Sequence, residues 1–163
     1  MKKKTTLPLG VISEATLRPM DLLHAFLGAL ESIRLSKANR ALVSDWRRLH
    51  NAWVRVGAFD DPSDAQAGSM DALRDELESI LNAHCPPYTY FGTLEGDGAC
   101  FGVFADYEAA VDDVDAGEIR YRDGAEKGYR GLMLDINDHG NVTLLDRQSF
   151  GHGYKDVVIW SIV

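Results

Sequence analysis

The sequence has few cysteines and no long apolar segment. Only two of its 163 residues are cysteine, Cys85 and Cys100, which excludes a small scaffold held together by disulfides. No apolar run approaches the roughly 18 residues that a membrane-spanning helix needs. The segment 5–13 is too short and too interrupted for the apolar core of a signal peptide. We therefore expect a cytoplasmic protein with no membrane segment, in which both thiols are structural and unpaired.

The sequence also lacks the short motifs that mark common enzymes and metal sites. It contains no Walker loop, no Gly-x-Ser-x-Gly turn and no His-Glu-x-x-His motif. None of its histidines stands at metal-ligand spacing from another histidine or from a cysteine pair. We expect no catalytic residue, no metal ion and no cofactor, and so a protein that is not an enzyme. One alternative stays open: a small enzyme whose polar groups converge in a pocket from strand ends and turns. Its candidate site residues are Tyr90, Glu95, Asp138 and His139.

Basic residues are scarce in most of the chain. The whole sequence carries 17 basic and 25 acidic side chains, a net charge of −8. Residues 1–56 hold ten basic and four acidic side chains, whereas residues 57–163 hold seven basic and 21 acidic ones. Because an acidic surface repels nucleic-acid phosphates, we do not expect the molecule as a whole to bind nucleic acid directly.

Helical periodicity fills the first half of the chain. The pattern predicts helices over about 19–33, 36–56 and 69–83, with a polar loop over 58–68. Two prolines at 86–87 end the third helix. The second helix carries an apolar stripe with spacings of 4, 3, 4 and 3, formed by Leu42, Trp46, Leu49, Trp53 and Val56.

Strand patterns fill the second half. Segments 88–94 and 99–105 flank a Glu-Gly-Asp-Gly turn and predict a hairpin. Segment 106–117 allows one or two helical turns, and further strands are expected near 118–122, 129–137, 142–147 and 156–163. The order predicts an α+β fold, with three N-terminal helices within about 14–84 packed on a C-terminal antiparallel β-sheet of about five strands within about 88–163. We expect a single domain over 1–163.

The densest acidic stretch lies between residues 106 and 118, where no basic residue occurs. Clustered carboxylates can bind a divalent cation, occupy a phosphate-binding site of a partner, or simply face solvent. The calcium-loop pattern that begins at Asp113 fails, because its twelfth position is Gly124 rather than the required glutamate. The candidate partner-binding residues are Asp106, Glu108, Asp112, Asp113 and Asp115.

The second predicted helix offers an alternative contact surface of opposite charge. At 100° per residue, several arginines gather on a face away from the apolar stripe. They can meet phosphates or an acidic partner, pair within the chain, or face solvent. The residues of this basic face are Arg40, Arg47, Arg48 and Arg55.

Three runs of the β-rich half carry a family resemblance. The run PYTYFGTLEGDGACFG at 87–102, and the runs DINDHGNVTL at 135–144 and IWSIV at 159–163, resemble small acidic proteins of unknown function from bacteriophages and other mobile elements. No catalytic residues are assigned in such proteins. The resemblance implies a protein that binds a host protein or nucleoprotein complex in the bacterial cytoplasm, as inhibitors of restriction and anti-CRISPR proteins do.

We therefore expect a non-catalytic interaction protein that contacts its partner through the acidic segment. A site that binds phosphates through lysine and arginine also attracts clustered carboxylates, with an affinity that falls as salt rises. The second alternative beside the small enzyme is a nucleic-acid accessory protein that uses the basic helix. The sequence does not indicate an oligomeric state.

Overall fold

The computed structural model describes residues 5–57 and 63–162, apart from the side chain at position 64. The described chain forms two compact units. Unit 1 comprises Met1–Cys85 and Tyr90–Phe104, and unit 2 comprises Pro86–Thr89 and Ala105–Val163. Among the described helices, none combines the length and the apolar character needed to cross a membrane.

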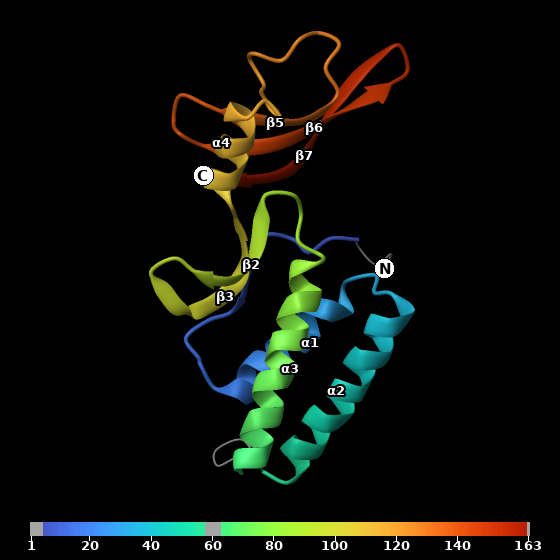
Figure 1. Cartoon of the computed structure of the whole chain (residues 1–163), viewed down its shortest axis with the longest axis vertical. Coiled ribbons are helices and arrows are strands. Elements are labelled where there is room, and N and C mark those ends of the chain that lie inside the picture. Colours follow the sequence, from blue (N-terminus) through green and yellow to red (C-terminus); the bar gives the residue numbers. More distant parts are fainter. Residues whose placement is uncertain (1–4, 58–62, 163) are drawn as a thin grey trace. The chain divides into compact units, whose positions relative to one another are not determined.

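Three helices form most of unit 1 (Figure 1): α1 (Pro19–Glu31), α2 (Lys37–Arg55) and α3 (Asp64–Asn82). Proline occupies the first turn of α1, where its missing N–H costs nothing. Ser36 caps α2 by accepting a hydrogen bond from Asn39 N–H. Helix α3 begins earlier than the sequence predicts, because Ser63 and Gln66 form a capping box. Of the expected loop, residues 58–62 lie outside the described part and residues 64–68 are helical.

The core of unit 1 lies between α1, α3 and a small sheet. Phe26 of α1 is fully buried and meets Phe91 edge to face, with ring centroids 4.9 Å apart. Helix α2 packs inward with a face that overlaps its predicted apolar stripe, because Leu42, Trp46 and Leu49 are partly buried against the core. Its buried residues are Val43, His50 and Trp53, whereas Val56 is 72% exposed.

The sheet of unit 1 has the strand order β1-β3-β2. Its strands are β1 (Gly10–Ser13), β2 (Thr89–Leu94) and β3 (Asp97–Ala105). Strand β1 runs antiparallel to β3 at the edge of the sheet, with Val11 opposite Gly102. Strand β2 is joined to the end of α3 by Asn82, whose Nδ2 donates to the Phe91 carbonyl (3.1 Å) while its Oδ1 accepts from Phe91 N–H (2.9 Å).

Unit 2 is a four-stranded sheet with one helix. The strand order is β4-β5-β6-β7, with β4 (Arg120–Tyr121), β5 (Gly131–Ile136), β6 (Val142–Phe150) and β7 (Gly153–Ile162). The β5–β6 and β6–β7 pairs are antiparallel, and β4 runs parallel to β5. Helix α4 (Tyr107–Asp115) precedes the sheet in the chain. The buried core includes Met133, Leu134, Leu144 and Trp160.

The predicted α+β class and the predicted hairpin are confirmed, but two finer predictions are wrong. Not all helices are N-terminal, because Asp106 caps a fourth helix, α4, by accepting from Ala109 N–H. The strands do not form one sheet of about five. Strand β1 pairs with β3, so that the described strands divide into sheets of three and four. The single domain over 1–163 stays a prediction.

Candidate functional site

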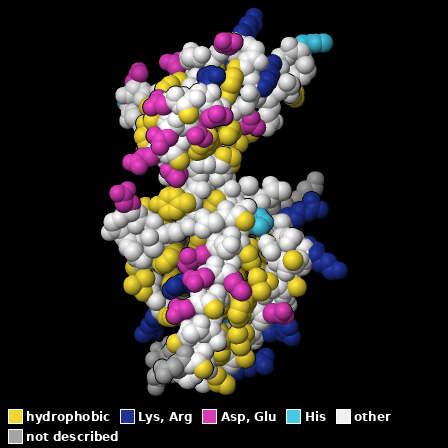
Figure 2. All heavy atoms as spheres, viewed as in Figure 1, with side chains coloured by type: hydrophobic (Ala, Val, Ile, Leu, Met, Phe, Trp, Pro, Cys, Tyr) yellow, Lys and Arg dark blue, Asp and Glu magenta, His cyan; other side chains and the backbone are white. Residues whose placement is uncertain are grey.

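Helix α4 carries three exposed carboxylates on one face. Glu108, Asp112 and Asp115 are exposed and follow one another at spacings of four and three residues, which places them along one side of a helix. Ala110 lies on the opposite side and is fully buried. We call these three residues the α4 acidic stripe. Figure 2 shows acidic side chains gathered over α4 in unit 2.

The other two predicted partner-binding residues have structural contacts. Asp106 caps α4 through Ala109 N–H. Asp113 is half-buried and accepts a hydrogen bond of 2.6 Å from the hydroxyl of Tyr88. Burial and this hydrogen bond raise the pKa of Tyr88 to about 12, so the hydroxyl remains a donor at neutral pH. The structure therefore leaves three of the five predicted carboxylates available to a partner.

The electrostatic environment of the stripe is unfavourable. The C-terminal end of a helix carries partial negative charge, and Asp112 and Asp115 lie in the last turn of α4 with no basic residue there. Glu108 and Asp112 repel each other at the i,i+4 spacing. Within residues 5–57 and 63–162, no carboxylate of the stripe forms an ion pair. Unit 2 as a whole contains twelve acidic and six basic side chains.

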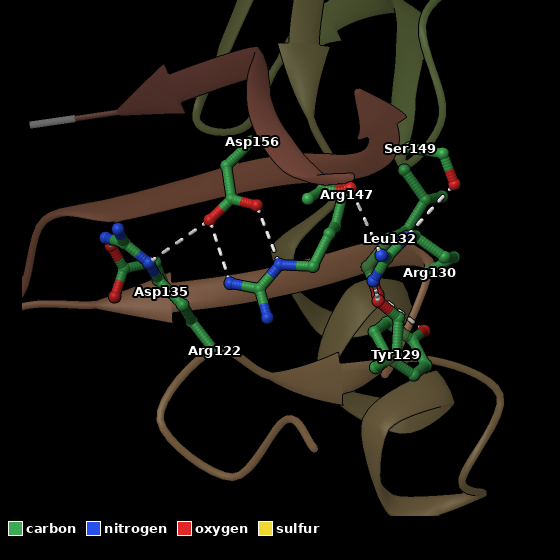
Figure 3. Close-up of polar contacts among 9 residues, drawn as sticks. Arg122, Tyr129, Arg130, Leu132, Asp135, Arg147, Ser149 and Asp156 are labelled. Carbon is green, nitrogen blue, oxygen red and sulfur yellow. Dashed lines mark hydrogen bonds and ion pairs between the residues drawn. The ribbon is translucent and has the colours of Figure 1, made fainter. Parts of the chain in front are cut away.

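Two arginines of unit 2, Arg147 of β6 and Arg122 next to β4, pair with carboxylates of the sheet (Figure 3). Arg147 donates twice to Asp156, through Nε (2.7 Å) and Nη2 (2.9 Å). The side chain of Arg147 is buried and that of Asp156 is partly buried. Arg122 bonds Asp135 at 2.8 Å and reaches Asp156 at 3.8 Å. The hydrogen bonds from Arg147 lower the pKa of Asp156. These pairs occupy Arg122 and Arg147, whereas Arg120 donates to the carbonyls of Gly117 and Ile119 just beyond α4. None of these arginines forms an ion pair with the stripe.

Most of the predicted basic face of α2 is engaged in local contacts. Arg47 pairs with Glu31 at 2.9 Å, and Arg48 pairs with Asp45 on the same helix. Arg40 donates to the Leu35 carbonyl at 3.0 Å. Arg55 is exposed at the end of α2. The four arginines are therefore not a uniform free cationic surface.

A groove in unit 1 is a second candidate site, and the sequence analysis does not predict it. The groove, of about 640 Å3, runs between α1 and α2. Its apolar wall includes Met20, Leu27 and Val54. Its polar groups are Asp21, His24 and Glu31 from α1, with Arg47, His50 and Asn51 from α2. Histidine spacing along the chain cannot reveal two imidazoles that helix packing brings together, as it does for His24 and His50.

The rings of His24 and His50 lie close together in this groove, with centroids 5.6 Å apart. His50 is only 7% exposed, and its Nε2 has no hydrogen-bond partner among the described residues. Burial, followed by the neighbouring His24, lowers the pKa of His50. Among the described residues, no three His, Cys, Asp or Glu side chains form a group that could hold a metal ion.

The residues proposed for the enzyme alternative divide between the units. Tyr90 and Glu95 belong to unit 1, whereas Asp138 and His139 belong to unit 2. Tyr90 donates to the Thr93 carbonyl within β2, and His139 N–H donates to the side chain of Asn137 in a turn. These contacts serve local structure.

Comparison of the chain with protein-family models, with curated proteins and with solved structures found no match.

Proposed function

We propose that this is a non-catalytic protein that binds a basic surface of a host protein or nucleoprotein complex through the α4 acidic stripe. The observation that carries the proposal is that three exposed carboxylates follow one face of α4, and none of them forms an ion pair within the described residues. Asp112 and Asp115 oppose the helix dipole, and no described basic side chain pairs with them. Charges that are unfavourable in the free protein and exposed to solvent fit a cationic partner that neutralises them on binding.

The proposed partner is a lysine- or arginine-rich surface, of the kind that otherwise binds nucleic-acid phosphates. Carboxylates attract such a surface over a distance of about one Debye length, roughly 10 Å at 0.1 M salt. The resemblance to phage and mobile-element proteins adds the proposal that the partner is a bacterial defence complex, which the protein inhibits in the host cytoplasm.

The test is capture of partners from a bacterial lysate by the full-length protein, at about 0.05 M and about 0.5 M salt. Three baits are compared: the wild type, a stripe variant (Glu108→Gln, Asp112→Asn, Asp115→Asn), and a control variant (Asp123→Asn, Glu126→Gln, Asp138→Asn). The control residues are also exposed and in unit 2, so both variants change the net charge of the same unit equally.

We expect one dominant complex that the wild type and the control variant retain at low salt, and that high salt releases. The stripe variant fails to retain it. Retention by the stripe variant contradicts the proposal, as does equal loss with both variants, because equal loss means that only net charge matters. Absence of any complex retained by the wild type also counts against it.

A further inference from the structure

The groove between α1 and α2 has the size of a small-molecule site. Pockets for such ligands commonly enclose about 300–1,000 Å3 and combine an apolar lining with a few polar groups. The groove of about 640 Å3 has this composition. Leu27 and Val54 face it from the two helices, and Gly28 adds no side chain to the α1 wall. An apolar body can therefore lie between the helices.

His50 supplies an unused hydrogen-bonding group in the wall of the groove. The side chain is more than nine-tenths buried, and its Nε2 has no partner among the described residues. Buried polar atoms in folded proteins are nearly always satisfied, because an unsatisfied one costs about 1–3 kcal/mol. The neighbouring ring belongs to His24, which is exposed and free to turn aside for a ligand.

The charges along the groove favour a cation. Asp21 forms no ion pair with a described basic residue, and its described side-chain contact is a hydrogen bond of 2.9 Å from the hydroxyl of Thr16. Glu31 is already paired at 2.9 Å with Arg47, the guanidinium that also lies near His50. Two carboxylates against one guanidinium leave the groove with an excess of negative charge, which repels anionic ligands. Since burial lowers the pKa of His50, its imidazole is neutral at pH 7 and can accept a hydrogen bond.

We propose that the α1–α2 groove binds a small organic ammonium ion, with its apolar body against Leu27 and Val54 and its N–H groups directed to His50 and Asp21. An ammonium group offers only donors, which match a neutral imidazole and a carboxylate. This site is separate from the α4 acidic stripe. The groove would bind a small molecule, whereas the stripe is proposed to bind a protein.

The test uses three probes of similar shape and different charge: benzylamine, benzyl alcohol and benzoate. Histidine imidazole resonances of the full-length protein are followed by NMR at neutral pH, and His24→Gln and His50→Gln variants assign them. Benzylamine is expected to shift the His24 and His50 resonances saturably, with a dissociation constant of about 1 mM, as is usual for a fragment of this size. Benzyl alcohol binds more weakly, and benzoate gives no saturable shift.

Two matched variants locate the site. Val54 is partly exposed and lines the groove, so Val54→Trp fills it without disturbing the core and abolishes binding. Val56→Trp makes the same exchange just beyond the end of α2, outside the groove, and binds as the wild type does. Asp21→Asn weakens benzylamine about tenfold, the effect of losing one charged contact, and leaves benzyl alcohol unchanged.

Three results overturn the proposal: no saturable shift with benzylamine, benzoate binding as tightly as benzylamine, or unchanged binding by Val54→Trp. The stripe variant of unit 2 must bind benzylamine as the wild type does. Failure of this proposal is therefore distinguishable from failure of the proposed protein contact.

Discussion

His50 is a titratable group that the fold keeps away from solvent. It faces His24 and Arg47, both of which disfavour its protonated form, whereas a side-chain hydrogen bond with Asn51 favours that form and partly offsets them. Burial has the largest effect and lowers the pKa below the usual 6.5. The unfolded chain therefore binds a proton at this residue at a higher pH than the folded chain does.

This difference predicts a pH dependence of stability. At pH values between 6.5, the ordinary pKa of histidine, and the lower pKa of folded His50, the unfolded state binds more protons than the folded state does. The free energy of unfolding therefore decreases as pH falls through this window. Urea denaturation at pH 7.5 and at lower pH values measures it. We expect His50→Gln to lose less stability on acidification than the wild type, and His152→Gln, at the exposed β6–β7 turn, to behave as the wild type does. Equal losses in all three proteins would contradict the burial of His50.

At the scale of the element, β1 depends on one glycine of β3. A Cβ atom at Gly102 would lie 2.5 Å from the Gly10 carbonyl oxygen and 3.0 Å from the Val11 Cα. Both atoms belong to the backbone of β1, so the strand itself must move to accept a side chain. Glycine in a strand often marks such a close approach of another backbone.

Gly102→Ala is therefore expected to destabilise unit 1 by about 1–3 kcal/mol, the usual cost of overpacking. The same exchange at Gly98, in the same strand, meets no atom within 4 Å and is expected to change stability by less than about 0.5 kcal/mol. Chemical denaturation of both variants measures the difference. Similar effects of the two exchanges would show that β1 does not pack against β3 in this way.

Helix α4 gives the opposite prediction, a stabilising substitution. Replacing Asp112 and Asp115 by asparagine removes two charges that oppose the helix dipole. We expect the free energy of unfolding to rise by about 0.5–1 kcal/mol at low salt, and the gain to shrink at high salt. A substitution that stabilises the fold and weakens binding identifies a functional charge. A loss of stability in this variant would mean that the two carboxylates have a structural role.

Local signals in the sequence predicted the individual elements better than their pairing. The helix starts predicted near residues 19 and 36 are confirmed, because the first-turn proline of α1 and the Ser36 cap of α2 depend only on adjacent residues. The capping box of Ser63 and Gln66 was overlooked, and α3 consequently begins five positions before the expected Ser69. The pairing of β1 with β3 joins segments far apart in the chain, which no local pattern specifies.

In the candidate sites too, features set by nearby residues could be predicted, and features set by tertiary packing could not. The spacing of Glu108, Asp112 and Asp115 predicts one exposed face as soon as α4 is recognised as a helix. The contact of Asp113 with Tyr88 depends on tertiary structure and could not be read from the acidic run. The α1–α2 groove could not be read from the sequence, because the burial of His50 beside the apolar stripe of α2 depends on how α2 packs against α1.

At the scale of the whole molecule, charge is distributed unevenly between the units. Unit 1 holds 11 basic and 13 acidic side chains, and unit 2 holds six and twelve. Within unit 2 the sheet arginines Arg122 and Arg147 are paired with sheet carboxylates. The excess negative charge of the protein is therefore concentrated in unit 2, where the α4 acidic stripe is exposed.

The most direct test of the proposed function is the affinity of the captured complex for the wild type, the stripe variant and the control variant. Isothermal titration calorimetry at low salt measures all three. The stripe variant is expected to bind at least about tenfold more weakly than the wild type, and the control variant within about twofold of it. Equal affinities of the stripe and control variants would contradict a partner contact through α4.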